Sequence, residues 1–577
     1  MDKYNVCACS LIGMACMSAL DCCATTKKDS NPNILLIVAD DLGFSDIQPF
    51  GGEIRTPNLT RLSDNGVCFT RFHTSSLSAP TRAMLLTGND NHQCGLGNMP
   101  PGHAENQYMQ SGYEGYINDR AITIAEVLKE NGYYTCMAGK WHLGALDGHT
   151  PDDKGFQNSF TMLAGGACHF ANVFPLSESE NPVTFYMENG KRIDKLPDDF
   201  YSSTDYTDKI MEYIDKCPAD KPFFAYLAYT APHDPLQVPD DWKDRYKGVY
   251  DCGYDSIRAA RFARQQQMGI VPEDAEFPVL TGDNPKWETL SDEKKREQSA
   301  KMEIYASMVE CMDYNIGRLL DRLELDGKLD NTIVIFMSDN GANPKEPYNY
   351  PGSSEEYIDK HYNNELENYG NPTSFISQGA AWAEISNTPY KRYKMTTNEG
   401  GICTPLIVSG KKFIKKSHID TNSLLHVTDI VPTILELTNT KRPETRNGIQ
   451  LAPLYGESFL TKLNSEINSN RILCFEMIEN KAVIRGDWKA VQLKKPYGDG
   501  VTWKLYNIKH DLSEEKDIAN VYPEILKELI TEWDKYSKSV GYIKSNGKST
   551  ISRIGSAEFY KYDEKNVLDE YKLESKN

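Results

Sequence analysis

Short, uninterrupted apolar segments alternate with amphipathic segments along most of this chain. The apolar segments lie at residues 33–39, 222–229, 332–337 and 405–408. Runs of this length without polar alternation are typical of strands buried on both faces of a parallel sheet. Helical periodicity lies between them, at residues 122–131 before Gly132 and at residues 302–325 before Gly327. The pattern therefore predicts an α/β fold in which helices cover both faces of a mostly parallel sheet.

A second pattern begins after the apolar segment 430–437. Residues 481–492 and 503–508 alternate in the manner of antiparallel strands, and residues 525–536 have the period of a packing helix. We therefore expect a main domain over residues 31–440, a smaller C-terminal α+β subdomain with an antiparallel sheet over 445–545, and a charged tail over 546–577.

Two polar stretches interrupt the main pattern, at residues 235–300 and 344–380. Both contain few apolar runs. We expect them to be excursions from the sheet, and long loops of this kind commonly carry function.

Residues 1–24 have the pattern of an export signal. A lysine opens the segment, an apolar stretch follows, and alanines lie near its end. A buried N-terminal helix is the alternative. Lipid attachment at Cys22 or Cys23 is a second open question, although Asp21 occupies a position where that modification requires a small residue. No later run is apolar and long enough to span a membrane.

The composition is that of a globular protein with a strong acidic excess. The chain has 577 residues, of which 40% are hydrophobic, and a formal net charge of -19. This charge argues against nucleic acid as a partner. It would also repel an anionic substrate at long range, so such a substrate would need a local cluster of cations. The nine cysteines after residue 24 include no CxxC pair, and no thiolate metal site is predicted.

Acidic side chains follow two of the predicted strands. Asp40 and Asp41 come directly after the strand at 33–39, and Asp339 and Asn340 follow the strand at 332–337. Ligands of open α/β sheets bind beyond the carboxyl ends of strands. Three carboxylates and one amide oxygen are ligands for a hard cation such as Ca²⁺ or Mg²⁺. Taken separately, each pair could equally be a turn or a helix cap.

Candidate cations and bases lie at the same predicted edge of the sheet. Lys140 and His142 stand two residues apart in Gly-Lys-Trp-His-Leu-Gly, so on extended chain they face the same side. His233 follows the strand at 222–229, and Lys394 precedes a glycine pair that leads into the strand at 405–408. The alternatives are a surface turn for Lys140 and His142, a structural role for His233, and an exposed loop position for Lys394.

A helix is expected from Ser78, in Ser-Ala-Pro-Thr-Arg, to Gly88. Serine is a good helix cap, and proline is tolerated in the first turn. Taken alone, the segment at Ser78 is an ordinary helix start. Close to the other polar clusters, the same helix N-terminus could also bind an anion, because it presents free N–H groups and a positive partial charge.

Together these motifs resemble the type I sulfatases. Asp-Asp after a strand, Ser-x-Pro-x-Arg with Leu-Thr-Gly, Gly-Lys-Trp-His-Leu-Gly, Pro-His, Ser-Asp-Asn-Gly and Lys-x-Thr-Thr-x-Glu-Gly-Gly occur in the family's order. The resemblance covers residues 31–540 and is closest to bacterial arylsulfatases, including the stretch 248–254. It implies an alkaline-phosphatase-like fold, hydrolysis of an aryl or carbohydrate sulfate, and a periplasmic location.

The resemblance also implies a role for each candidate residue. Ser78 would be oxidised to formylglycine (3-oxoalanine), whose hydrated form attacks sulfur; a serine at this position implies an oxygen-independent maturation enzyme as a partner. Arg82 would steady the hydrated group. The remaining assignments are a Ca²⁺ site from Asp40, Asp41, Ser78, Asp339 and Asn340, a sulfate grip from Lys140 and Lys394, and proton transfer by His142 and His233.

Two other functions remain open from the sequence. One is a phosphomonoesterase or phosphodiesterase of the alkaline-phosphatase superfamily, although such enzymes generally use two transition metals with several histidine ligands, and Asp339 is followed here by Asn340. The other is a non-catalytic glycan-binding relative in which Ser78 is never converted.

Overall fold

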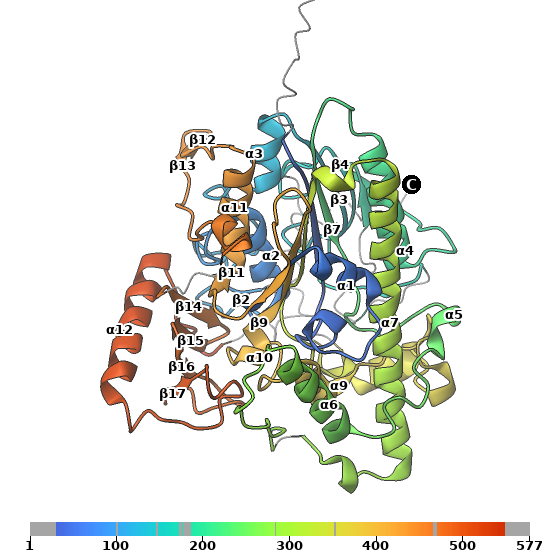
Figure 1. Cartoon of the computed structure of the whole chain (residues 1–577), viewed down its shortest axis with the longest axis vertical. Coiled ribbons are helices and arrows are strands. Elements are labelled where there is room, and N and C mark those ends of the chain that lie inside the picture. Colours follow the sequence, from blue (N-terminus) through green and yellow to red (C-terminus); the bar gives the residue numbers. More distant parts are fainter. Residues whose placement is uncertain are drawn as a thin grey trace, which may run out of the picture. The chain divides into compact units, whose positions relative to one another are not determined.

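The computed structural model describes residues 31–99, 102–145, 148–171, 176, 186–282, 284–350, 353–465 and 470–548 (Figure 1). The predicted export segment 1–24 and most of the predicted tail lie outside the described residues. The nine cysteines after residue 24 are free thiols. No helix in the described part is long and apolar enough to cross a bilayer.

A large mixed sheet forms the centre of the fold. Within the described ranges it has the strand order β10-β2-β9-β8-β1-β7-β3-β4-β5-β6, with β11 also paired to β2. Its strands are β1 Asn33–Ala39, β2 Gly66–His73, β3 Tyr134–Lys140, β4 Asn158–Met162, β5 Tyr186–Glu188, β6 Lys191–Ile193, β7 Phe223–Ala228, β8 Thr332–Ser338, β9 Cys403–Ser409, β10 His418–Asp420 and β11 Leu425–His426.

The middle of this sheet confirms the predicted parallel core. Strand β1 pairs in parallel with β7 and β8, and β3 pairs in parallel with β7 and β4. The four predicted apolar segments are β1, β7, β8 and β9. Strand β9, however, runs antiparallel to both of its neighbours, β2 and β8. Its apolar run did not reveal this, because burial on both faces leaves the same pattern in either direction.

Helices cover both faces of the sheet (Figure 1). Leu35 and Ile37 of β1 face a core shared with α1, α4 and α7, whereas Leu36 and Val38 face a core shared with α2, α3 and α11. The helices are α1 Pro57–Asp64, α2 Ser78–Thr87, α3 Ile124–Glu130, α4 Ser202–Asp215, α5 Asp240–Lys243, α6 Tyr254–Gln267, α7 Asp292–Leu325, α8 Glu355–His361, α9 Gly379–Ser386, α10 Glu399–Ile402, α11 Ile430–Leu437 and α12 Pro523–Val540.

Several helices differ from the sequence-based expectation, among them α5 and α8, which lie inside the two polar stretches. Helix α7 begins ten residues before the predicted start, at a cap where Ser291 accepts a hydrogen bond from the N–H of Lys294. Helix α6 lies inside the stretch that was predicted to be a loop. Its buried face includes Arg258 and Arg261, and buried arginines conceal the apolar period on which helix prediction depends.

A smaller antiparallel sheet follows, as predicted. It consists of β14 Ile472–Met477, β15 Asn480–Arg485, β16 Trp488–Gln492 and β17 Lys504–Asn507. Helix α12 packs Leu529 and Trp533 on one face of it. On the other face, Phe475 packs with Ile402 of the main domain. A two-stranded ribbon, β12 Thr445–Arg446 and β13 Ile449–Gln450, lies before this sheet in the chain.

Candidate active site

Two adjacent strand ends bring the acidic residues together. Ala39 of β1 pairs with Ser338 of β8, so the residues after each strand emerge side by side. The N–H of Asp41 donates to Oδ1 of Asp339 at 3.1 Å, and Nδ2 of Asn340 donates to Oδ1 of Asp41 at 2.6 Å. Asp40 is fully buried beside them.

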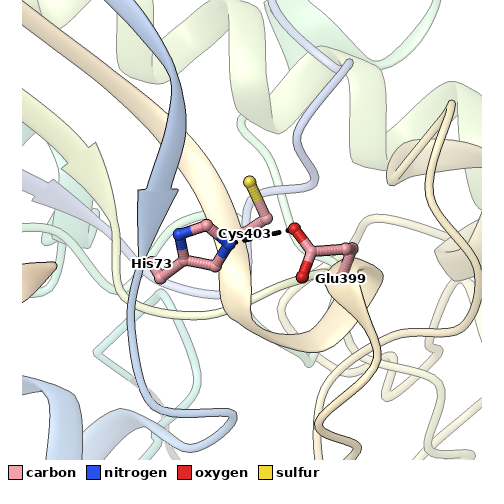
Figure 2. A group of neighbouring side chains, drawn as sticks. All are labelled: His73, Glu399 and Cys403. Atoms are coloured by element: carbon pink, nitrogen blue, oxygen red, sulfur yellow. Dashed lines mark hydrogen bonds and ion pairs between the residues drawn. The ribbon is translucent and has the colours of Figure 1, made fainter. Parts of the chain in front are cut away.

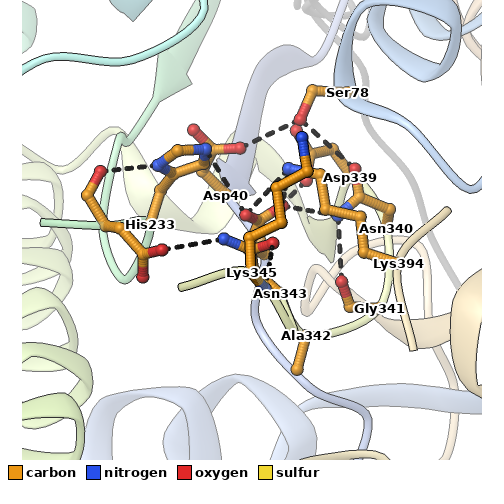
Figure 3. A network of polar contacts seen from close by, with 12 residues as sticks. Asp40, Ser78, His233, Asp339, Asn340, Gly341, Ala342, Asn343, Lys345 and Lys394 are labelled. Carbon is orange, nitrogen blue, oxygen red and sulfur yellow. Dashed lines mark hydrogen bonds and ion pairs between the residues drawn. The ribbon is translucent and has the colours of Figure 1, made fainter. Parts of the chain in front are cut away.

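Ser78 lies on this cluster (Figure 3). Its Oγ is 3.1 Å from Oδ1 of Asp40 and 3.2 Å from Oδ1 of Asn340. Ser78 is the first residue of α2, and its hydroxyl does not cap the helix; the capping position belongs to Leu77. The side chain is therefore turned towards the carboxylates, with the helix N-terminus behind it.

Three cationic side chains pair with the three carboxylates. Nε and Nη2 of Arg82 donate to Oδ2 of Asp339 at 3.0 and 2.7 Å. Nζ of Lys140, at the end of β3, donates to Oδ2 of Asp40 at 2.7 Å. Nζ of Lys394 lies 2.7 and 2.8 Å from the two carboxylate oxygens of Asp41. Asp40, which pairs with Lys140, is also the carboxylate to which the Ser78 hydroxyl donates.

The charges of this cluster shift one another's pKa values. Burial would raise the pKa of Asp40, but the positive charges of Lys140 and Arg82 outweigh it and lower that pKa to about 2. Lys394 likewise outweighs burial and lowers the pKa of Asp41. Burial lowers the pKa of Lys140 despite Asp40, whereas Asp41 more than offsets burial at Lys394 and raises its pKa. Asp40 and Asp41 therefore remain ionised at neutral pH.

The two predicted histidines, His142 and His233, both lie close enough to the cluster for its charges to shift their pKa values. Nε2 of His233 is 3.5 Å from Oδ2 of Asp41, and its Nδ1 donates to the carbonyl oxygen of Asp234 at 2.7 Å. Burial lowers the pKa of His233 although Asp41 opposes the shift. Burial and the positive charges of Lys140 and Arg82 hold the pKa of His142 well below its usual range. His142 is therefore a neutral imidazole at neutral pH.

Residues that the sequence reasoning did not select complete the wall near His233. The carboxylate Oδ2 of Asp234 accepts hydrogen bonds from Nδ2 of Asn343 at 2.9 Å, the hydroxyl of Tyr350 at 2.8 Å and the hydroxyl of Ser377 at 2.7 Å. Burial raises the pKa of Asp234 to about 7. Lys345 lies in the same segment, alongside Lys394 (Figure 3). The position of Asp234 next to His233 in Pro-His-Asp-Pro was the only local signal for this group.

The donor set fits a hard cation. Ligand atoms of Asp40, Asp41 and His233 lie within 4.8 Å of one another, and Asp339 and Asn340 add two further oxygen donors. Carboxylate and amide oxygens without a thiolate favour Ca²⁺ or Mg²⁺ over transition metals.

A second compact group, His73, Glu399 and Cys403, has a different character (Figure 2). Nε2 of His73 donates to Oε2 of Glu399 at 2.9 Å. The other oxygen of Glu399 accepts from Nζ of Lys489 at 2.6 Å. Because a lysine already compensates the carboxylate, this is a buried structural ion network and not a metal site.

The fold and the cation-lined acidic cluster define a hydrolase of the alkaline-phosphatase-like class. Residues 32–440 match the family model described as Sulfatase. The chain therefore belongs to the sulfatase family and is an enzyme that hydrolyses sulfate esters.

Similar proteins agree with this assignment. The chain is 40% identical over 449 residues to an arylsulfatase of Klebsiella aerogenes, covering 78% of this chain and 95% of that protein. It is 39% identical over 546 residues to an uncharacterised sulfatase of Schizosaccharomyces pombe, covering 92% and 97%.

Solved structures show the same fold. The crystal structure of Ps i-CgsB in complex with k-i-k-neocarrahexaose has a TM-score of 0.62 at 22% identity, covering 92% of this chain and 99% of that one. The phosphonate monoester hydrolase of Agrobacterium radiobacter has a TM-score of 0.53 at 16% identity, covering 88% and 96%.

Proposed function

We propose that this sulfatase uses a formylglycine derived from Ser78 and one Ca²⁺ held by Asp40, Asp41, Asp339 and Asn340, and that it acts on an aryl or carbohydrate sulfate. The observation that supports this most strongly is the position of Ser78. Its hydroxyl lies at a helix N-terminus, within 3.2 Å of two of the proposed cation ligands.

The formylglycine and the Ca²⁺ would supply chemistry that the encoded side chains lack. The oxidised side chain supplies an electrophilic carbon that carries the nucleophilic oxygen, and the cation supplies positive charge for the sulfate oxygens. The residues around them are arranged to serve both. Arg82 is held by two hydrogen bonds to Asp339, so its guanidinium can orient the group at position 78 without losing a proton.

The lysines are placed to bind the sulfate. Lys140 approaches the cluster from the end of β3 and Lys394 from the loop before α10, and both ammonium groups are buried. In a water-poor site, two fixed cations stabilise a sulfate anion and the charge that develops in the transition state far more than they would in water.

The histidines are placed to move protons. Nδ1 of His233 is committed to the carbonyl of Asp234, which leaves Nε2 to hold a proton for the departing oxygen. A bound sulfate would add negative charge and raise the pKa of His233, so the ring would carry that proton when the ester is present. Neutral His142 is suited to accept a proton. General acid–base assistance of this kind contributes about 10²–10⁴-fold.

Mass spectrometry and turnover together test the proposal. The protein is co-expressed with an oxygen-independent maturation enzyme, and the peptide containing residue 78 is weighed; conversion to the aldehyde removes the mass of H₂. We expect the converted protein to hydrolyse 4-nitrophenyl sulfate and Ser78→Ala to be inactive. Full activity in protein whose residue 78 remains serine would overturn the formylglycine mechanism.

A matched aryl phosphate discriminates the phosphatase alternative. We expect the converted enzyme to favour the aryl sulfate, because the donor set suits one hard cation and a singly charged ester. A preference for 4-nitrophenyl phosphate would contradict this assignment. An unconverted Ser78 in protein from the native host would instead favour a glycan-binding role.

A further inference from the structure

One lysine near the active site has no carboxylate partner among the described residues. Lys345 lies in the segment that follows Asn340, and its side chain is partly exposed. Within the described ranges, its ammonium group makes no ion pair and lies over the ring of Tyr350, 5.2 Å from the ring centroid. Lys140 and Lys394, by contrast, each pair with an aspartate at 2.7 Å.

The segment that carries Lys345 is anchored beside the proposed general acid. Asn343 and Tyr350, on either side of Lys345, both donate to the carboxylate of Asp234. Asp234 is the chain neighbour of His233 and fixes its ring through the backbone carbonyl. Lys345 is therefore held near the side of the site from which the alcohol or phenol departs.

The electrostatic setting of Lys345 favours a bound anion. Burial and the nearby charge of Lys394 lower the pKa of Lys345 to about 8, even though Asp41 and Asp234 oppose the shift. A cation that is partly removed from water next to a second cation is relieved by an incoming negative group. The protein has a net charge of -19, which repels a doubly charged substrate at long range. Such a substrate therefore needs a local cation for its second negative group.

The transferring sulfate already has Lys140, Lys394 and Arg82 around its proposed position. We propose that Lys345 is a specificity-determining residue that binds a second anionic group, a carboxylate or a further sulfate, on the leaving-group part of the substrate. This assignment rests on the proposed function, since it takes the Ser78 cluster as the place of the scissile sulfate.

Binding to a non-turnover enzyme tests the inference independently of maturation. In the Ser78→Ala background, Kd is measured by calorimetry for phenyl sulfate and for a carboxyphenyl sulfate, with Lys345 or with Lys345→Met. We expect the substitution to weaken carboxyphenyl sulfate by about 10- to 100-fold, the range for one charged hydrogen bond, and to change phenyl sulfate by less than about threefold. Lys345→Arg should retain the preference. Lys360→Met, an exposed lysine of α8, is the control and should change neither value.

Turnover by the converted enzyme gives the second readout. We expect Lys345→Met to raise KM for the carboxylated ester with kcat for phenyl sulfate unchanged. Equal weakening of both esters would show that Lys345 contacts the scissile sulfate or supports the fold, and unchanged binding of both would show that it contacts neither. Either result overturns the inference. Failure of the proposed function is seen separately, as residue 78 that is never converted or as an inactive converted enzyme.

Discussion

At the scale of single residues, packing against Gly165 fixes the position of the His142 ring. Within the described residues, its Nδ1 is buried without a hydrogen-bond partner, and its backbone has a positive φ of 57°. Gly165 faces the ring: a Cβ built there would lie 2.6 Å from Cε1 and 2.7 Å from Nε2 of His142. Only a glycine at this position leaves the imidazole where it is.

This contact predicts the effect of a single methyl group. Gly165→Ala should displace the His142 ring and lower kcat by about 10- to 100-fold, since misplacing a catalytic group by about 1 Å can cost 10²-fold. The midpoint of thermal unfolding should change little, because both residues are partly exposed. Steady-state kinetics with 4-nitrophenyl sulfate measure the effect.

Gly282→Ala is the matched control. A Cβ at Gly282 meets no atom of the described residues within 4 Å, and its φ is outside the left-handed region. We expect wild-type kcat for this variant. If Gly165→Ala were as active as Gly282→Ala, His142 would not be a proton-transfer residue in the position described here.

At the scale of elements, the C-terminal sheet holds the segment that delivers Lys394. Glu399, five residues after Lys394, bonds to Lys489 of β16, and its N–H donates to Oε2 of Glu514 at 2.8 Å. Lys489 is fully buried and lies 3.1 Å from Oε1 of Glu514. Nδ2 of Asn480 in β15 also donates to the carbonyl of the residue after Lys394, at 2.9 Å. The smaller sheet is thus part of the support of the active site.

Removing Lys489 should therefore destabilise the enzyme strongly. Lys489→Met would leave Glu514 buried without a cation and Glu399 with only His73 as its side-chain partner, at a cost of about 3–5 kcal/mol. Arg485→Met in the same sheet removes only the exposed pair with Glu528 and should cost less than about 1 kcal/mol. Urea denaturation of both variants measures the difference, and equal losses would contradict the role given to Lys489.

At the scale of the whole folded unit, a buried histidine joins the small sheet to the segment that follows α2. Nδ1 of His92, which follows α2, lies 3.0 Å from Oδ1 of Asp90, and its Nε2 lies 2.9 Å from Oε2 of Glu476 in β14. Burial would lower the pKa of His92, but the two carboxylates outweigh it and raise that pKa to about 9. The charged ring therefore ties β14 of the small sheet to the segment after α2 in the main domain.

The upward shift of the His92 pKa predicts how the free energy of unfolding depends on pH. The folded-state pKa of His92 lies above the unfolded value of about 6.5, so its contribution is complete below pH 6.5 and is lost as pH rises through 9. We expect wild type to lose about 3 kcal/mol more stability than His92→Gln between these pH values. Urea denaturation at pH 6 and pH 9.5 measures the difference. Parallel losses in both proteins would show that His92 is not the charged link.

Much of the fold and of the candidate site was predictable because short segments of the sequence determine it. Asp40, Asp41, Asp339 and Asn340 directly follow apolar segments, and adjacent parallel strands must bring their carboxyl ends together. Ser78 and Arg82 are one helical turn apart, so a single helix start positions both. For these residues, short-range pattern and the geometry of a parallel sheet are sufficient.

Only the tertiary structure decided the remainder. Lys345 lies in a polar stretch and Lys489 in a predicted strand, and neither position shows a role by itself. The role of Lys489 depends on the carboxylates of Glu399 and Glu514, and that of Lys345 on having no ion-pair partner among the described residues. The antiparallel direction of β9 and the buried arginines of α6 are likewise outcomes of packing between elements. The sequence by itself determined the family, the strand-end acids and the helix that carries Ser78. The tertiary structure decides which charged side chains form ion pairs and which one can bind the substrate. This depends on contacts between segments far apart in the sequence, and a local sequence pattern does not contain that information.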